Sequence, residues 1–234
     1  MDYYKTLAAA YVRGCAEKNK IKLRYELKSV PLELLTEEQI EEIISVGNRS
    51  GLKMYRFKGK EDLPRVKMAL GFLKSVYPEN LLDVGSGRGV FLFPFLRDFP
   101  NTNVTSIDLL RYRVDFLHAM KLGGIDRLTT LQKDICLWNA PGTSFDIVTM
   151  LEVLEHIPDY EKAVQTAVRL ARRYVVVSVP SKPDNNPEHI HLLTKEKLTA
   201  AFEQAGVAKL QFSGVNGHLF MIAKKEEYGR NKTY

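Results

Sequence analysis

Strand-like and helix-like segments alternate along the chain from residue 61 onward, and this order restricts the possible folds more than any other feature. Short apolar runs typical of buried strands are separated by longer segments whose apolar residues recur at helical spacing. Strands that alternate with helices pair in parallel, because each helix returns the chain to the same edge of the sheet. The expected strands are residues 80–84, 103–108, 128–132, 144–151 and 174–180, and the expected helices are 64–77, 89–99, 111–122, 159–171 and 195–205.

The chain continues with two more strand-like segments, residues 207–213 and 218–224, which are joined by the sequence GVNG. A turn of this kind favours a tight hairpin, so an antiparallel pair is expected at one edge of the sheet. The predicted fold class is α/β, with a doubly wound, mostly parallel sheet that carries helices on both faces. Ligands of such sheets bind beyond the carboxyl ends of the strands, which makes the residues just after each strand the informative ones.

Residues 1–60 follow a different pattern and are predicted to be mostly helical. The segment from residue 4 to residue 15 places its apolar side chains on one helical face. Thr36 and Gln39 have the spacing of a capping box, and Gly47 is expected to end the helix that follows. The sequence IKLRYEL, residues 21–27, alternates apolar and polar positions and is predicted to be a half-buried strand.

The formal net charge of +6 is concentrated near the two ends of the chain. Three parts are predicted: a substrate-capping appendage over residues 1–60, a main domain over 61–224 and a basic tail over 225–234. Basic ends can attract an anionic substrate or a nucleic acid, although a solvated basic surface without a binding role is the commoner case.

Composition excludes several other classes of protein. Apolar residues make up 45% of the chain, which is enough for a sizeable core and argues against global disorder. No apolar run approaches the roughly 20 residues that cross a bilayer, and the N-terminus lacks the apolar core of a signal peptide. The two cysteines, Cys15 and Cys136, have no metal-binding spacing. These features predict a protein of the reducing cytoplasm that makes no membrane contact.

A glycine-rich turn follows the first expected strand of the main domain. In DVGSGRG, residues 83–89, Gly85, Gly87 and Gly89 are spaced G-x-G-x-G, whereas dinucleotide-binding turns read G-x-G-x-x-G. Glycines let the backbone turn sharply and let a ligand approach the free N–H groups at the start of a helix. The preceding acid, Asp83, suits a ligand with an ammonium group better than it suits a pyrophosphate.

Two more acids follow the second and third expected strands. Asp108, in SIDLL, stands where an acid accepts hydrogen bonds from ribose hydroxyls in nucleoside-binding α/β folds. Asp134, in QKDI, can accept a hydrogen bond from an exocyclic amino group, and Ile135 beside it offers an apolar flank. The turn and the two acids are therefore predicted to converge on one nucleoside-containing ligand.

These motifs resemble those of class I S-adenosylmethionine-dependent methyltransferases, and the resemblance covers residues 61–223. It implies a seven-stranded sheet whose last strand is inserted antiparallel, with S-adenosylmethionine as the cofactor. It also implies which residues hold each part of that cofactor. Asp108 would bind the ribose, and Glu152 would lie close to the cofactor. The adenine would be contacted by Leu109, Asp134 and Ile135, and the methionine end would be held by Asp83, Gly85, Ser86, Gly87 and Gly89.

The fourth expected strand is followed by EVLEH, which places two carboxylates and an imidazole at Glu152, Glu155 and His156. One helical turn would cluster these groups, and His189 and His191 of the later HIH segment would share one side of an extended backbone. Such a group suits a divalent metal or a hydrogen-bonded network. The arrangement resembles metal-dependent ubiquinone-pathway O-methyltransferases and small-RNA 2′-O-methyltransferases, and equally family members without a metal. We predict His156 and Glu155 as catalytic residues and assign no metal ligand.

The predicted reaction is an in-line transfer of a methyl group to an oxygen or nitrogen atom of a small-molecule acceptor. Correct orientation of the reactants can lower the barrier by roughly 7–11 kcal/mol, and an oxygen nucleophile also needs a base or a metal. One alternative is an RNA methyltransferase recruited through the basic N-terminal segment. Another is a cofactor-binding subunit or sensor without enzymatic activity. Neither the acceptor nor the oligomeric state can be predicted from the sequence.

Overall fold

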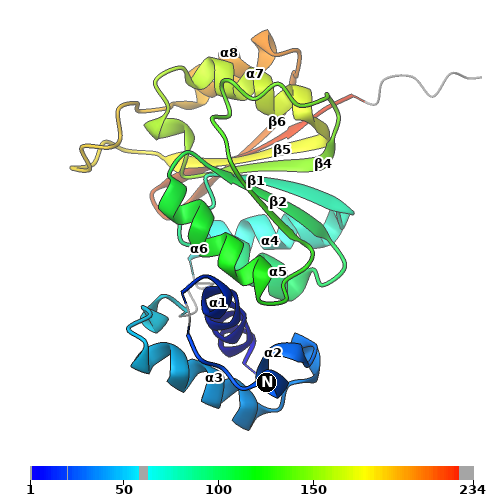
Figure 1. Cartoon of the computed structure of the whole chain (residues 1–234). Helices are drawn as coiled ribbons and strands as arrows, with labels where there is room; N and C mark the ends of the chain where they lie inside the picture. The colour runs from blue at the N-terminus through cyan, green and yellow to red at the C-terminus, as the bar shows by residue number, and fades with distance from the viewer. Residues whose placement is uncertain (1, 20, 58–62, 227–234) are drawn as a thin grey trace, which may run out of the picture. The chain divides into compact units, whose positions relative to one another are not determined.

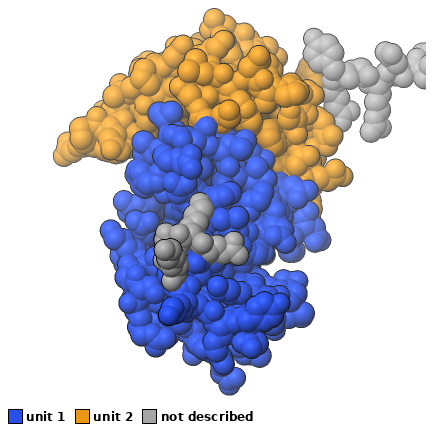
Figure 2. Space-filling view, viewed as in Figure 1, with its two compact units in different colours: residues 1–62, 86–132 blue, residues 63–85, 133–234 orange. Residues whose placement is uncertain are grey.

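The computed structural model of the protein describes residues 2–19, 21–57 and 63–226. The chain divides into two compact units, which Figure 2 shows in blue and orange. The first unit comprises residues 1–62 and 86–132, and the second comprises residues 63–85 and 133–234. The predicted boundary after residue 60 and most of the predicted tail over 225–234 lie outside the described residues. The three-part division of the chain therefore stays a prediction.

The described residues form one seven-stranded sheet with the order β3-β2-β1-β4-β5-β7-β6, which confirms the predicted fold class (Figure 1). The pairs β1–β4, β2–β3 and β4–β5 are parallel, while β7 is antiparallel to both β5 and β6. The strand bounds are β1 Asn80–Val84, β2 Asn103–Asp108, β3 Leu128–Gln132, β4 Phe145–Leu151, β5 Ala171–Pro180, β6 Lys209–Val215 and β7 His218–Lys224.

The predicted hairpin between β6 and β7 is confirmed, but its turn has only two residues, because β6 runs to Val215 and includes the first half of the GVNG connection. Val215 pairs with His218, so Asn216 and Gly217 alone form the connection. Both have positive φ values, 37° for Asn216 and 81° for Gly217. This combination is typical of a type I′ turn, whose twist matches that of the paired strands. The turn thus sets the register that brings His218 to the start of β7.

The second unit contains helices α4, Pro64–Val76, α7, Tyr160–Leu170, and α8, Lys195–Gln204. Figure 1 shows α7 and α8 on one face of β4 and β5, with α4 on the other face. Pro64 occupies the first turn of α4, where its missing N–H would have had no helical partner. The side chains of Asp159 and Thr194 cap α7 and α8 by accepting from the backbone N–H groups of Lys162 and Lys197.

The first unit contains the N-terminal helices together with two helices that flank β2. The bounds are α1 Tyr3–Asn19, α2 Tyr25–Ser29, α3 Glu37–Arg49, α5 Leu92–Asp98 and α6 Arg111–Leu122, with short 3-10 turns η1 Leu32–Leu34 and η2 Met54–Arg56. The predicted capping box is confirmed, because Thr36 and Gln39 exchange side-chain and backbone hydrogen bonds at the start of α3.

The N-terminal helix α1 packs closely against α6. A Cβ atom on Gly14 would lie 1.8 Å from the carbonyl oxygen of Ala119, and one on Gly123 would lie 1.7 Å from that of Ala10. Only glycine at these two positions allows the two backbones to approach so closely. The N-terminal segment is therefore built into the packing of the first unit.

The predicted strand over residues 21–27 is wrong. Residues 21–24 have no regular structure, and helix α2 begins at Tyr25, whose side chain is 78% exposed. Leu27 is buried, as the alternation of apolar and polar residues predicts. However, no strand in the described part of the chain lies beside this segment to pair with it. A short helix pairs its backbone groups locally, whereas a single strand would leave them unpaired.

Two helix bounds also differ from the prediction. Gly47 lies within α3, which continues to Arg49, and a Cβ at Gly47 would be 2.5 Å from the Val12 side chain. The glycine there serves packing against α1 and does not end the helix. Helix α5 begins at Leu92 and not at residue 89, because the glycine-rich turn continues through residues 86–91.

Candidate active site

The glycine-rich turn after β1 adopts the backbone conformation that its sequence predicts. Gly85, Gly87 and Gly89 have φ values of 67°, 57° and 80°, which L-residues with side chains rarely adopt. A Cβ on Gly85 would lie 2.6 Å from Val153, and one on Gly89 would lie 2.3 Å from the Phe93 ring. Conformation and space therefore both require glycine at positions 85 and 89.

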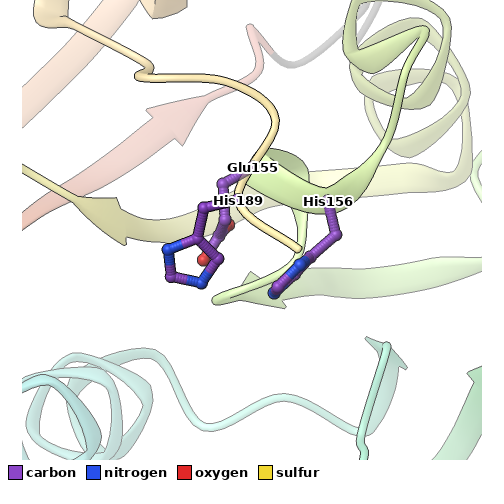
Figure 3. Close-up of side chains that lie close together, drawn as sticks. All are labelled: Glu155, His156 and His189. Atoms are coloured by element: carbon purple, nitrogen blue, oxygen red, sulfur yellow. The ribbon is translucent and has the colours of Figure 1, made fainter. Parts of the chain in front are cut away.

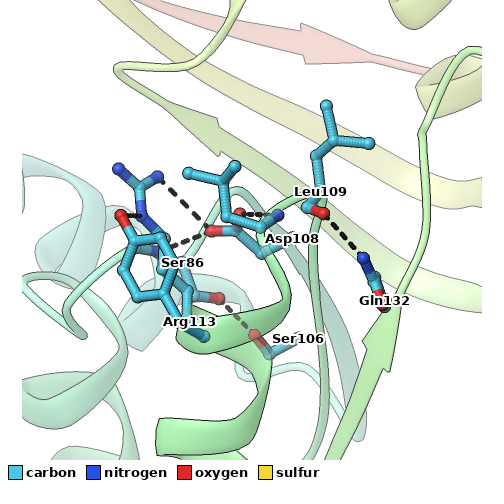
Figure 4. A network of polar contacts seen from close by, with 9 residues as sticks. Ser86, Ser106, Asp108, Leu109, Arg113 and Gln132 are labelled. Atoms are coloured by element: carbon cyan, nitrogen blue, oxygen red, sulfur yellow. Dashed lines mark hydrogen bonds and ion pairs between the residues drawn. The ribbon is translucent and has the colours of Figure 1, made fainter.

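Asp108, at the end of β2, holds this turn from within the first unit (Figure 4). The carboxylate is 5% exposed and accepts hydrogen bonds from the backbone N–H groups of Gly87 at 3.2 Å and Leu110 at 2.9 Å. The Arg113 guanidinium lies 3.6 Å away, and the hydroxyls of Ser86 and Ser106 are 2.7 Å apart. These contacts fix the position of a carboxylate beside the turn.

Leu109 is an apolar side chain left on the surface beside Asp108. It is 62% exposed, and its carbonyl accepts a hydrogen bond from the Gln132 side chain at 3.1 Å. Figure 4 shows Leu109 anchored through this bond. An exposed leucine held in place next to a buried acid provides a flat apolar contact for a ring.

Asp83 and Asp134, the remaining predicted acids, lie in the second unit. Asp83 is 2% exposed and accepts a hydrogen bond from the Thr149 hydroxyl at 2.8 Å. Asp134 accepts from the backbone N–H of Cys136 at 2.8 Å, which fixes the loop after β3. Ile135 is buried, and the exposed apolar residue of this loop is Leu137, at 81%. Burial next to Asp134 and Asp159 raises the pKa of the Cys136 thiol to about 11, so the thiol is neutral.

Glu152 stands in a strained backbone conformation immediately after β4. Its φ is 58°, an uncommon value for a residue other than glycine. The carboxylate is held by three other elements of the second unit: it accepts from the Ser178 hydroxyl at 2.6 Å, contacts His218 Nε2 at 2.8 Å and lies 3.8 Å from Arg65. Strain that is held by several contacts is typical of functional positions.

Glu155, His156 and His189 form a cluster in the second unit, and one potential ligand atom from each lies within 4.8 Å of the others. Figure 3 shows the three side chains pointing toward one region, two from the segment after β4 and His189 from the segment after β5. His156 Nδ1 donates to the backbone carbonyl of Glu188 at 2.8 Å, and His189 Nδ1 lies 2.8 Å from the Asp184 carboxylate. The carbonyl acceptor favours a proton on Nδ1 of His156, which leaves the Nε2 lone pair of that ring available. Nδ1 of His189, in contrast, makes no hydrogen bond within the described residues.

The Glu155 carboxylate is fully buried, and neither of its oxygen atoms has a hydrogen-bond partner among the described residues. Burial raises the pKa of Glu155 to about 8, with a smaller contribution from the Glu152 charge. A buried carboxylate without partners is costly, so it either carries a proton or pairs with a cation. A carboxylate and two imidazole nitrogens are a donor set that a borderline divalent cation accepts.

The structure brings together only part of the group that the sequence proposed. Glu152 points into its own contacts with Ser178 and His218 and does not join the Glu155 cluster. His191 also lies elsewhere, with Nε2 3.1 Å from the Pro158 carbonyl oxygen and its ring against Tyr160. His189 alone comes from the later segment, because the backbone N–H groups of Ile190 and His191 bond to the Glu155 carbonyl and turn His189 inward.

Three residues of this region were missed by the sequence interpretation. Arg65 contacts Glu152 from α4, Ser178 from β5 and His218 from β7. No local sequence motif indicates a site role for Arg65. The sequence did contain a signal for Ser178 and His218. Ser178 interrupts a run of valines and His218 begins a strand, so each is a polar group placed beside an apolar core.

The strand order, together with the loops after β1, β2 and β4, defines a Rossmann-like α/β fold of the methyltransferase type. A family model described as "Methyltransferase domain" matches residues 55–211, and the chain belongs to this family. Solved structures with this fold include some with bound S-adenosylhomocysteine, the product that S-adenosylmethionine leaves after methyl transfer.

Curated relatives with detectable similarity are ubiquinone biosynthesis O-methyltransferases. The protein of Paracidovorax citrulli is 34% identical over 110 residues, which cover 45% of each chain. That of Colwellia psychrerythraea is 25% identical over 166 residues, which cover 60% of this chain and 65% of the relative. The chain therefore matches less than two thirds of the length of either relative.

Among solved structures, the Burkholderia thailandensis 1,6-didemethyltoxoflavin-N1-methyltransferase, with bound 1,6-didemethyltoxoflavin and S-adenosylhomocysteine, has the same fold. The two structures agree with a TM-score of 0.57 at 21% identity, and the match covers 79% of this chain and 86% of that one. At this identity the likeness concerns the fold alone.

Proposed function

We propose that the protein transfers a methyl group from S-adenosylmethionine to a hydroxyl oxygen of a small-molecule acceptor. One observation carries the choice of oxygen: the buried carboxylate of Glu155, without partners, lies beside the imidazoles of His156 and His189. A hydroxyl must lose a proton to become a good nucleophile, and such a cluster can accept it. The similarity to ubiquinone biosynthesis O-methyltransferases supports the same choice.

We further propose that the residues predicted from the sequence bind the cofactor. Asp83 and the turn of Gly85, Ser86, Gly87 and Gly89 would hold the methionine end, and the Asp108 carboxylate would accept hydrogen bonds from the ribose hydroxyls. Leu109, Asp134 and Ile135 would contact the adenine, with Glu152 nearby. The glycine conformations, the fixed Asp108 carboxylate and the exposed Leu109 side chain support these roles.

The cofactor supplies a methyl group that is already activated on a sulfonium sulfur. The chain's own residues must orient the acceptor and take one proton from its hydroxyl. His156 is suited to take this proton at Nε2, because its Nδ1 already donates to the Glu188 carbonyl. Glu155, whose pKa is raised to about 8, would be charged above that pH and would then stabilise the resulting imidazolium.

A divalent cation is an alternative way to promote loss of the same proton. Glu155 would supply a carboxylate oxygen, and His156 and His189 would each supply one ring nitrogen. The buried carboxylate without partners and the fixed Nδ1 position of His156 fit a cation at this place. A bound cation would acidify an acceptor hydroxyl.

The experiment has two stages. Calorimetric titration with S-adenosylhomocysteine first measures cofactor binding, for which we expect one site. Transfer of a labelled methyl group is then measured for a panel of phenols, amines and total RNA, with added Mg²⁺, Mn²⁺ or Zn²⁺ and with a strong chelator. Labelling of phenols only supports an oxygen acceptor, whereas labelling of amines alone would overturn it. Activity that survives chelation supports His156 as the base that takes the hydroxyl proton, without help from a metal.

RNA remains the second candidate acceptor, and total RNA in the panel tests it. Two basic side chains of the N-terminal segment are engaged in ion pairs, Lys5 with Glu37 and Glu41, and Arg24 with Glu42. These pairs reduce the charge available to a polymer, which supports the small-molecule acceptor. None of the described helices is long and apolar enough to cross a membrane. Cytoplasmic localisation stays a prediction.

A further inference from the structure

Glu152 has a strained backbone conformation, and its position in the chain gives that strain a consequence. Its φ of 58° lies in the left-handed region, where a side chain crowds the backbone and where glycine is the residue without strain. Glu152 and Val153 join β4 to the 3-10 turn η3, Leu154–His156. This turn carries Glu155 and His156. The direction in which these two side chains leave the sheet therefore depends on the conformation of Glu152.

Contacts from other elements of the second unit hold Glu152 in this conformation. Ser178 in β5 binds it twice: the Ser178 carbonyl accepts from the Glu152 backbone N–H at 2.9 Å, and the Ser178 hydroxyl donates to Oε1 of the carboxylate at 2.6 Å. His218 Nε2 lies 2.8 Å from Oε2, the other carboxylate oxygen. Strained residues persist only where their surroundings determine the conformation in several ways. The contact with His218 is one of these determinants.

The hairpin between β6 and β7 places His218 at this carboxylate. His218 pairs with Val215 of β6 and with Pro180 of β5, at the point where β7 begins. Its Nδ1 lies 3.1 Å from the carbonyl oxygen of Asn216 in the turn, so the ring is held at both nitrogen atoms. A shift of the register by one residue would turn the ring to the other face of the sheet. The two-residue turn thus determines which side chain meets Glu152.

The segment that follows Glu152 contacts two other parts of the candidate site. Val153 packs against the glycine-rich turn so closely that a Cβ on Gly85 would lie 2.6 Å from it. The carbonyl of Glu155 accepts from the backbone N–H groups of residues 190–191 at 3.0 and 3.3 Å. A change in the conformation of Glu152 would disturb both contacts, because it would redirect the backbone that makes them.

We propose that His218 is a positioning residue for methyl transfer, which acts by holding Glu152 and thereby fixes the direction of Glu155 and His156. The inference rests on the proposed function, in which His156 takes the acceptor proton beside Glu155. His218 acts through Glu152 and requires no contact with the acceptor. Such a role matters to the rate, because a misplacement of about 1 Å can slow a reaction by about 100-fold.

The test compares variants of the full chain. His218→Leu removes the N–H donor, whereas His218→Gln keeps an N–H donor that can reach Glu152. Lys224→Leu, at the exposed far end of β7, is the matched control for an apolar substitution in the same strand. Glu152→Ala, alone and combined with His218→Leu, tests whether the histidine acts through the glutamate.

The first measurement is amide hydrogen exchange, which needs no acceptor. In His218→Leu we expect peptides over residues 152–158 and 188–192 to exchange at least about tenfold faster, since the hydrogen bonds of these segments open more often. His218→Gln and Lys224→Leu should exchange like the wild type. A merely structural role in the hairpin would accelerate exchange over residues 209–224 only, and this result would overturn the inference.

The second measurement is transfer of a labelled methyl group to the acceptor that the panel identifies. His218→Leu should lower kcat by roughly 10- to 100-fold with little change in KM, and His218→Gln should restore most of it. In the Glu152→Ala background, His218→Leu should cost no more than about twofold, because the two changes remove the same contact. Equal losses for leucine and glutamine, or full additivity with Glu152→Ala, would overturn the inference while the proposed function stands.

The wild type distinguishes this failure from failure of the proposed function. If the unaltered chain neither binds S-adenosylhomocysteine nor transfers a methyl group, the proposed function fails and the inference fails with it. If it does both and His218→Leu changes neither exchange nor kcat, the inference alone is overturned.

Discussion

Glu155 is the residue whose environment most constrains the chemistry. Its pKa is raised from 4.5 to about 8 by burial, so the folded protein holds this proton at a pH where the unfolded chain has released it. The proton-linked stability is complete below pH 4.5 and is lost as the pH rises toward 8. A bound cation would reverse the effect, because it would stabilise the charged form.

We therefore expect the free energy of unfolding of the metal-free protein to fall by a few kcal/mol between about pH 5 and pH 8 relative to Glu155→Gln. Glutamine does not titrate, so the variant lacks this slope. Urea unfolding at several pH values in a chelating buffer measures it, with the exposed Glu203→Gln as the control. Parallel curves for wild type and Glu155→Gln would contradict the assignment.

Asp108 provides the second residue-scale prediction. Asp108→Asn keeps the size of the side chain but removes the charge that accepts from Gly87 and Leu110 and that we propose binds the ribose. Loss of charge-assisted hydrogen bonds should weaken affinity for S-adenosylhomocysteine by roughly 10- to 100-fold. Calorimetric titration measures this. Asp115→Asn, which removes a surface charge paired with Arg111, should leave the affinity unchanged, and equal effects would refute the special role of Asp108.

At the scale of elements, the contact between α1 and α6 explains why the N-terminal segment contains a glycine inside a helix. Gly14 packs directly against the backbone carbonyl of Ala119, and Gly123 packs equally closely against that of Ala10. The same helix α1 carries Tyr4 to a cavity of about 120 Å³ that η2 and the glycine-rich turn also line. Packing at two glycines therefore places an N-terminal side chain at that cavity.

We expect Gly14→Ala to lower the free energy of unfolding by about 1–3 kcal/mol, because its Cβ would lie 1.8 Å from the Ala119 carbonyl oxygen. Gly71→Ala in α4 is the matched control, since a Cβ there meets nothing within 4 Å. That variant should gain about 0.5–1 kcal/mol from helix propensity. Thermal or urea unfolding of both variants measures the difference, and a neutral Gly14→Ala would show that the helices can move apart.

Elements governed by local patterns were predictable from the sequence, and those governed by distant partners were not. The glycine-rich turn and the Asn216–Gly217 hairpin require positive φ values that few residues adopt, so their sequences are distinctive. The choice of His189 over His191 depends on two backbone hydrogen bonds to the Glu155 carbonyl, which no sequence spacing reveals. The failed strand over residues 21–27 has the right alternation but no partner strand.

At the scale of the whole molecule, net charge and site chemistry lead to different expectations. From its formal charge of +6 we expect the chain to bind polyanions nonspecifically at low salt, whatever its substrate. The proposed site chemistry, a buried carboxylate beside two imidazoles, in contrast requires a hydroxyl group and not a polyanion. Binding to RNA and methylation of RNA are therefore separate questions.

We expect RNA to bind weakly at 50 mM salt and to be released at about 200 mM, with no labelled methyl group transferred to it at either concentration. Nonspecific phosphate contacts lose roughly 10³–10⁵ in affinity over this range when six to ten are made. Filter binding and methyl labelling, measured on the same samples, separate the two properties. A phenol that is labelled in the panel should accept the methyl group at both concentrations, because a small molecule of this kind makes no phosphate contacts. Transfer to RNA that persists at 200 mM salt would reverse this conclusion and make the N-terminal segment a polymer-binding surface.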